Sequence, residues 1–235
     1  NAIKKMRSLG KHSVVFLDHW VNYRERFTRS VETCLPDEIW VGDAMADVMA
    51  KNLFPDTTIC LLENPYVNDI RQELAAVKVQ GVTSSDGIAV LYVCEPVREH
   101  ALLRFGDERH WGYVEEEALR YFLANIATLG SPISRVLIRP HPSEPINKYN
   151  WALYEFDLPI EMGGARTLIE EMTESDVVVG CESMAMVVGL VAGKRVISCI
   201  PPEGKPCGLP HCEIEKLHIL LKTKTTNSES KEYDE

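Results

Sequence analysis

Two short apolar runs decide the fold that we expect for this chain: RVLIRPHPS at residues 135–143 and DVVVGCESMA at residues 176–185. Each run is rich in β-branched residues and stops abruptly at polar ones, as buried strands of parallel sheets do. The first ends in Arg139 and His141, and the second leads to Ser183. Because ligands bind at the carboxyl ends of the strands in an open α/β sheet, these polar residues predict a site at that edge.

Strand-like and helix-like segments alternate along the rest of the chain. Further strands are expected at residues 13–17, 37–41, 58–62, 88–93, 158–161 and 195–200, and helices within residues 20–34 and at 43–52, 67–77, 111–129, 165–172 and 182–192. Asp43 is the expected N-cap of the second of these helices. Such alternation predicts an α/β fold with parallel sheets joined by right-handed crossovers.

A small, polar, turn-forming stretch, VTSSDG at residues 82–87, interrupts this alternation and predicts a domain boundary. We therefore expect two Rossmann-like lobes, residues 1–84 and residues 85–222, followed by a loosely held polar tail at residues 223–235. The first lobe is short for this architecture, so we expect it to be incomplete, with its first strand–helix units preceding Asn1.

The composition excludes several classes of protein. A length of 235 residues suits one large domain or two small ones, and the net charge of −10 argues against a nucleic-acid partner, which needs a basic surface. Seven cysteines without a CxxC pair favour a reducing, cytoplasmic compartment. Cys207, His211 and Cys212 lack a fourth ligand at metal spacing, so no metal site is expected. No apolar run approaches the roughly 20 residues of a membrane span.

His141 is the sharpest candidate for chemistry. Prolines on both sides restrict its backbone and keep it off any helix. An imidazole held in this way can donate to a phosphate oxygen or carry a proton to a leaving group near neutral pH. Arg139 can support the same anion. The alternative is a rigid loop with a solvated histidine.

The start of the helix after residue 180 is a second candidate, for phosphate binding. A helix N-terminus offers free backbone N–H groups and a positive dipole end, and the Ser183 hydroxyl adds a donor. Glu182 opposes a phosphate unless its carboxylate turns away, for example towards a sugar hydroxyl. The alternative is that Ser183 only caps the helix.

Acidic residues at other strand ends are weaker candidates. Asp18 can accept a proton from an acceptor hydroxyl, with His19 beside it, or can cap the following helix. Glu95 and Glu161 can bind ribose or base hydroxyls, or can be turn residues. We expect Glu115, at the start of an EEE run, to lie on a solvated helix start. The predicted catalytic set is thus Asp18, His19 and His141, and the predicted substrate-binding set is Glu95, Arg139, Pro142, Ser143, Glu161, Glu182, Ser183 and Met184.

The His141-Pro142 pair, followed some forty residues later by Ser183 at a helix start, resembles the HP and S motifs of two-lobed GT-B glycosyltransferases. The likeness is to bacterial sialyltransferases, polysialyltransferases and other capsule or lipopolysaccharide transferases, with teichoic-acid glycerophosphotransferases similar in the same places. It covers roughly residues 88–200. The acidic pair followed by glycine that carries the catalytic base in sialyltransferases has no match in the first lobe, so Asp18 is chosen by position alone.

The resemblance implies an inverting, metal-independent glycosyltransferase of bacterial surface polysaccharide synthesis. His141 and Ser183 would contact the phosphate of a nucleotide-sugar donor, with a CMP-sugar favoured, and no cofactor would be needed. The acceptor would be a glycan or lipid-linked glycan, and the protein would be cytoplasmic, able to associate with the inner face of the membrane. The alternatives are an enzyme resembling UDP-N-acetylglucosamine 2-epimerase and a non-catalytic nucleotide-sugar-binding module.

Overall fold

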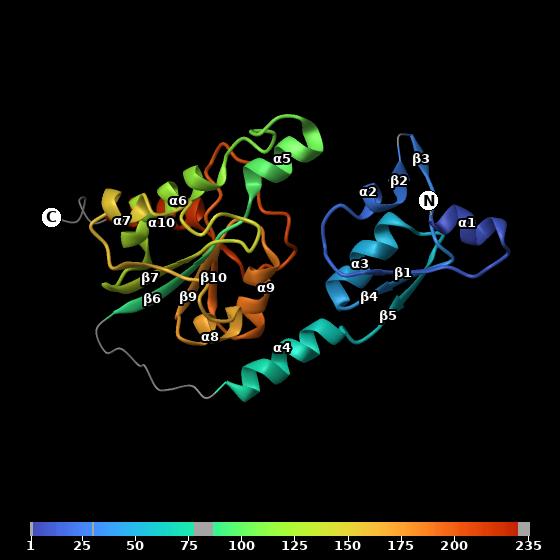
Figure 1. The fold of residues 1–235 in the computed structure, drawn as a ribbon, viewed down its shortest axis with the longest axis horizontal. Helices are drawn as coiled ribbons and strands as arrows, with labels where there is room; N and C mark the ends of the chain where they lie inside the picture. Colours follow the sequence, from blue (N-terminus) through green and yellow to red (C-terminus); the bar gives the residue numbers. More distant parts are fainter. Residues whose placement is uncertain (1, 30, 78–86, 230–235) are drawn as a thin grey trace. The chain divides into compact units, whose positions relative to one another are not determined.

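The protein folds into two compact α/β units in a computed structural model that describes residues 2–29, 31–77 and 87–229 (Figure 1). The first unit comprises residues 1–69 with 208–210, and the second comprises residues 70–207 with 211–235. The expected lobe boundary between residues 84 and 85 lies outside the described residues, so it stays a prediction.

The first unit contains a three-stranded parallel sheet with the strand order β1-β4-β5. Its helix α3 begins as predicted, because the Asp43 side chain accepts the backbone N–H of Ala46 at 2.8 Å. The helix expected within residues 20–34 forms as the short α2, and an antiparallel hairpin, β2–β3, follows it. The elements of this unit are α1 (Ala2–Ser8), β1 (Val14–Leu17), α2 (Tyr23–Phe27), β2 (Thr28–Arg29), β3 (Glu32–Thr33), β4 (Glu38–Val41), α3 (Ala44–Leu53) and β5 (Thr58–Leu61), and α4 (Pro65–Ala76) comes next in the chain.

The second unit is built on a six-stranded sheet in which all neighbouring strands are parallel. Its strands are β6 (Ile88–Val93), β7 (Ile133–Arg139), β8 (Ile160–Met162), β9 (Val177–Gly180), β10 (Arg195–Ser198) and β11 (Glu215–Lys216). The spatial order is β11-β10-β9-β6-β7-β8. The chain therefore builds outwards from β6 through β7 to β8, returns to the other side of β6 at β9, and continues outwards to β11. This order is doubly wound and Rossmann-like, and the parallel strands confirm the α/β fold that the alternation predicted.

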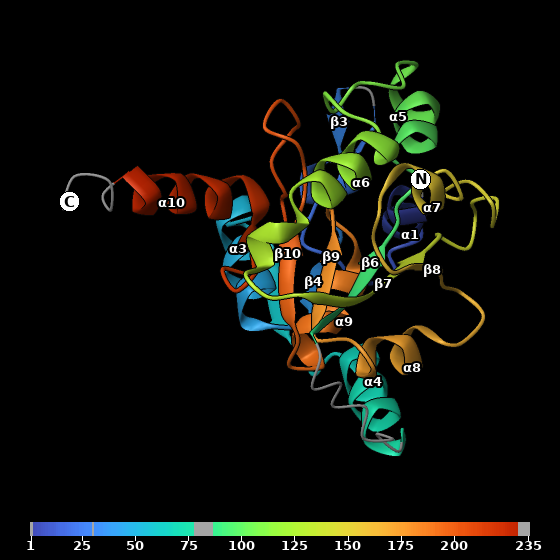
Figure 2. The same ribbon diagram turned by 90° about the vertical axis from the view of Figure 1, so that its left-hand side faces the viewer.

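Helices cover both faces of this sheet (Figures 1 and 2). On one face lie α5 (Val97–Phe105), α6 (Glu115–Ala124), a 3₁₀ turn (Ile126–Leu129), α7 (Ala152–Glu155) and α10 (Leu217–Glu229), and on the other lie α8 (Leu168–Thr173) and α9 (Met184–Val191). Side chains of β6, β7 and α6 form the centre of the core, including the fully buried Val90, Phe122, Val136 and Ile138. No described helix has both the length and the apolar character that a bilayer crossing would need.

The bounds of helices α6 and α10 differ from the sequence-based expectation. The helix expected at residues 111–129 begins only at Glu115 and gives way to the 3₁₀ turn, which Gly130 ends with a φ of 84°. Helix α10 begins at Leu217, which is completely buried in the core, and continues into the expected polar tail as far as Glu229.

Candidate functional site

The candidate site lies at the carboxyl edge of the six-stranded sheet, where the strand order reverses between β6 and β9. In open α/β sheets, this switch point is where ligands bind. Glu95 follows β6, Ser183 follows β9, and His141 follows β7. The two motifs were expected on neighbouring units, but β6 lies between β7 and β9, so these strands are about 10 Å apart at the usual strand spacing. Glu95 follows the strand between them.

A tight turn holds His141. The backbone N–H of Glu144 donates to the carbonyl of His141 at 2.9 Å, and the backbone N–H of His141 donates to Glu144 Oε2 at 2.9 Å. The imidazole Nδ1 accepts the backbone N–H of Ser143 at 3.2 Å and lies 2.7 Å from Ser143 Oγ. An Nδ1 that accepts an N–H carries no proton in the neutral ring, so we assign the proton to Nε2. His141 is partly exposed, and Pro142 and Ser143 are exposed.

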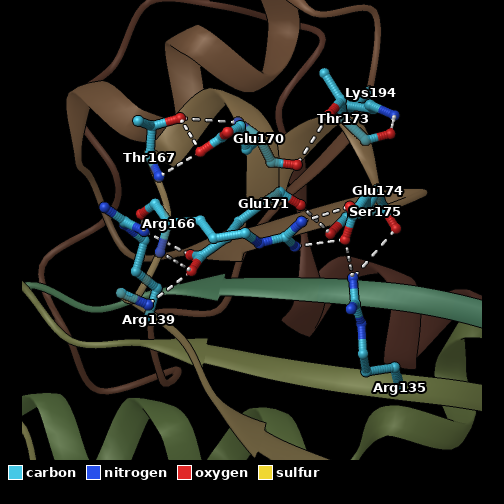
Figure 3. A network of polar contacts seen from close by, with 11 residues as sticks. Arg135, Arg139, Arg166, Thr167, Glu170, Glu171, Thr173, Glu174, Ser175 and Lys194 are labelled. Atoms are coloured by element: carbon cyan, nitrogen blue, oxygen red, sulfur yellow. Dashed lines mark hydrogen bonds and ion pairs between the residues drawn. The ribbon is translucent and has the colours of Figure 1, made fainter. Parts of the chain in front are cut away.

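Arg139 is already paired on the α8 side of the sheet (Figure 3). Its Nη1 lies 2.5 Å from Glu171 Oε2 and 2.9 Å from the carbonyl oxygen of Arg166. The same Glu171 carboxylate, whose side chain is 2% exposed, accepts the backbone N–H of Gly164 at 2.7 Å. Glu171 thus ties the end of β7 to the loop between β8 and α8. An anion at Arg139, as the sequence predicted, would have to compete with this buried carboxylate.

The start of α9 already holds a carboxylate. Glu95 Oε1 accepts the backbone N–H of Cys181 at 3.0 Å and that of Glu182 at 2.7 Å. These are the donors that we expected a phosphate to use. Burial raises the pKa of Glu95 to about 7, against the lowering effect of hydrogen bonds from the backbone of Glu182, Cys181 and Ser183. The structure thus places Glu95 on the backbone donors at the start of α9 rather than free for a ribose.

Ser183 occupies the N-cap position of α9, yet its side chain makes no capping hydrogen bond. Its Oγ is buried and has no hydrogen-bond partner among the described residues. The simple capping alternative is therefore not realised, and this hydroxyl remains available as a donor. The neighbouring Glu182 and Met184 are partly exposed.

Glu161 does not stand at a strand end as expected. It lies in the middle of the edge strand β8, opposite Leu137, and its side chain is exposed. Strand β8 is one strand further from the switch point than the strand that leads to His141.

In the first unit, the predicted catalytic residues lie at the end of β1. The exposed Asp18 side chain pairs with Arg26 Nη1 at 2.8 Å, and the His19 ring lies against Trp20 with centroids 5.9 Å apart. Trp20 Nε1 donates to Asp43 Oδ2 at 2.8 Å. Asp18 thus pairs with Arg26 on helix α2 rather than capping it, and its role as a base stays a prediction.

Sequence reasoning missed a buried ionic cluster beside the His141 turn. Lys148 Nζ donates to Glu144 at 2.9 Å, to Glu99 at 3.1 Å and also to Glu115. Ligand atoms of these three glutamates lie within 4.8 Å of one another, as in many cation sites, but the Lys148 ammonium already contacts all three. Glu115 is 2% exposed, so the expectation of a solvated helix start is wrong there. The i,i+4 spacing of Glu144 and Lys148 was the one local signal.

Comparisons with known proteins give a likeness in structure but none in sequence family. No protein-family model matches the chain, and no curated protein matches it. Among solved structures, it is similar to Thermosulfurimonas dismutans KpsC, a beta Kdo 2,4 transferase, with a TM-score of 0.38 and 19% sequence identity. The match covers 66% of this chain and 50% of that one, so the chain spans about half the length of that structure.

Proposed function

We propose that the chain is a glycosyltransferase unit that takes its sugar from a nucleotide donor, with a CMP-sugar favoured. The supporting observation is the His141 turn, which presents an Nε2–H donor at the carboxyl edge of a doubly wound sheet, beside its switch point. A phosphate at the start of a helix near a switch point is the common way in which such sheets hold nucleotides. The buried, unpartnered hydroxyl of Ser183 adds a second donor at that place.

In the proposed reaction, an acceptor hydroxyl attacks the anomeric carbon of the donor while the nucleotide phosphate leaves. His141 Nε2–H and Ser183 Oγ–H donate to the phosphate oxygens, where negative charge builds up in the transition state. The proposed base is Asp18 or His19, which would take the proton of the acceptor hydroxyl. The configuration would be inverted and no metal would be used. The acceptor is proposed to be a glycan of the bacterial surface, reached from the cytoplasmic side of the membrane.

One observation favours a second candidate, a non-catalytic module that does not bind nucleotides in this way. The Glu95 carboxylate occupies the backbone donors that a phosphate would need. A donor phosphate must therefore displace Glu95 or bind when Glu95 is protonated. If neither happens, the site is closed to phosphate.

Calorimetric titration with CMP, CDP, UDP and UDP-N-acetylglucosamine separates these candidates. We expect CMP to bind the wild-type protein and the His141→Ala variant to bind it about tenfold more weakly, because one charge-assisted hydrogen bond is lost. The exposed His100 serves as the control, and His100→Ala should bind CMP as the wild type does. Wild-type protein that binds none of the nucleotides would favour the non-catalytic module. Epimerised UDP-N-acetylglucosamine in NMR spectra would favour the epimerase instead.

A further inference from the structure

Glu144 fixes the backbone of His141 from both sides of the residue. Its main-chain N–H closes the turn onto the His141 carbonyl, and its side-chain Oε2 accepts the His141 N–H, each at 2.9 Å. A residue held at both its N–H and its C=O has little freedom in φ and ψ. The Ser143 N–H can reach the imidazole Nδ1, at 3.2 Å, only while this turn keeps its shape.

The carboxylate of Glu144 is itself held by two buried donors. Its Oε1 accepts the Tyr149 hydroxyl at 2.7 Å and Lys148 Nζ at 2.9 Å. The Glu144 side chain is 1% exposed, and Tyr149 is 0% exposed. Buried, charge-assisted hydrogen bonds of this kind are strong and specify one geometry.

Helices α5 and α6 complete the anchor through Lys148. Glu99 on α5 and Glu115 on α6 both accept from its ammonium, and Glu115 also accepts the backbone N–H of Arg98 at 2.8 Å. Burial alone would lower the pKa of Lys148, but its hydrogen bonds to Glu115, Glu144 and Glu99 raise it above the ordinary value. The ammonium thus stays charged and connects the His141 turn to two helices of the scaffold.

We propose that Glu144 is the positioning residue for His141, and that through the turn it keeps the imidazole in the Nε2–H form that donates to the donor phosphate. The hydrogen bond from His141 to the donor phosphate rests on the proposed function. Without the Glu144 carboxylate, the turn loses its side-chain closure, the Ser143 N–H no longer fixes Nδ1 as the acceptor, and both tautomers become populated. Glu144 itself need not touch any substrate.

The test measures directly which nitrogen of the His141 imidazole is protonated. In protein labelled with ¹⁵N-histidine, long-range ¹H–¹⁵N correlation spectra recorded at high pH report which ring nitrogen carries the proton, and His141→Gln assigns the signals. We expect the wild type to show a protonated Nε2 and a bare Nδ1. In Glu144→Ala, the two nitrogen shifts should move towards each other. The control is Glu99→Gln, which removes a partner of Lys148 without touching the turn and should leave the His141 signals in place.

If Glu144→Ala does not fold, as judged by circular dichroism, Glu144→Gln takes its place, and we expect smaller movements in the same direction. His141 nitrogen shifts at wild-type positions in the folded variant would overturn the positioning role. CMP titration is the second readout, with about tenfold weaker binding expected for Glu144→Ala. A wild type that binds no CMP would remove the proposed function, while the tautomer spectra would still decide the role of Glu144.

Discussion

At the scale of single residues, the Glu95 carboxyl makes stability depend on pH. Burial raises its pKa in the folded protein to about 7, whereas the unfolded chain has the ordinary value of 4.5. The neutral form is therefore favoured by folding, and its stabilising effect is complete below the unfolded pKa. That effect is lost as the pH rises through the folded pKa, at a cost of about 3 kcal/mol in unfolding free energy.

We expect this loss to disappear in Glu95→Gln, which keeps the shape and an acceptor oxygen but does not titrate. Urea unfolding at several pH values between about 4 and 8 measures the unfolding free energy of both proteins. The wild type should lose stability relative to the variant across this range. Parallel pH profiles for the two proteins would show that Glu95 ionises as freely when folded as when unfolded.

The buried pair between Glu171 and Arg139 gives a second residue-scale prediction. In the largely buried ion pair, Arg139 Nη1 lies 2.5 Å from Glu171 Oε2. Glu171→Gln removes the negative charge that balances the Arg139 guanidinium. Removing one partner of a buried ion pair typically costs about 3–5 kcal/mol, so we expect a loss near the lower end in urea unfolding. Glu170→Gln is the matched control, because the exposed Glu170 accepts the backbone N–H of the N-cap Thr167 and a glutamine oxygen can accept the same hydrogen bond, so this change should cost far less than Glu171→Gln. Equal losses would mean that the pair adds no more than a cap.

At the scale of elements, the sequence predicted those helices and strands whose pattern lies within the segment itself. Residues 88–93 and 177–180 are strands at the expected positions, because short β-branched runs bounded by polar residues favour buried strands. Asp43 caps α3 as its position required. Helix α5 was missed because its apolar residues do not follow one face, and Leu102 and Leu103 are exposed.

The candidate site was predictable only in part, because its assembly is non-local. His141 and Ser183 could be found from their own neighbours, but nothing near Glu95 indicates that its carboxylate meets the N–H of Cys181, 86 positions away. The partners of Lys148 on α5 and α6 likewise lie 49 and 33 positions from it. Strand order, which places β6 between β7 and β9, follows from the packing of the whole sheet and not from any one segment.

The junction between β9 and α9 depends on Gly180. A Cβ at this position would lie 2.8 Å from Val93 Cγ2 on β6 and 3.2 Å from Met186 Sδ. Gly180→Ala should therefore destabilise the protein by about 1–3 kcal/mol through overpacking. In the double variant with Val93→Ala, which removes the closest contact, the total loss should be smaller than the sum of the single losses, as a double-mutant cycle by urea unfolding can measure. Additive losses would mean that the β6–β9 contact does not require glycine.

At the scale of the whole molecule, the hydrophobic core of the second unit is built from residues of that unit, as far as the structure describes them. The residues that form it run from Ile88 to Leu221, and none belongs to the first unit. All six strands of its sheet and both helical layers fall within the same part of the chain. A domain with its own core can fold alone. We therefore expect a fragment of residues 87–235 to fold without the first unit.

The fragment should show a cooperative urea transition, near-UV circular dichroism and no binding of the hydrophobic dye ANS. Because the His141 turn and its Lys148 cluster lie wholly inside it, the Nε2–H signal of His141 should match that of the full chain. Gly180→Ala should cost the same free energy in both. A fragment with helical far-UV signal, no near-UV signal and strong dye binding would be a molten globule. In that case residues before Gly87, α4 among them, would supply part of the packing that gives the sheet its fixed structure.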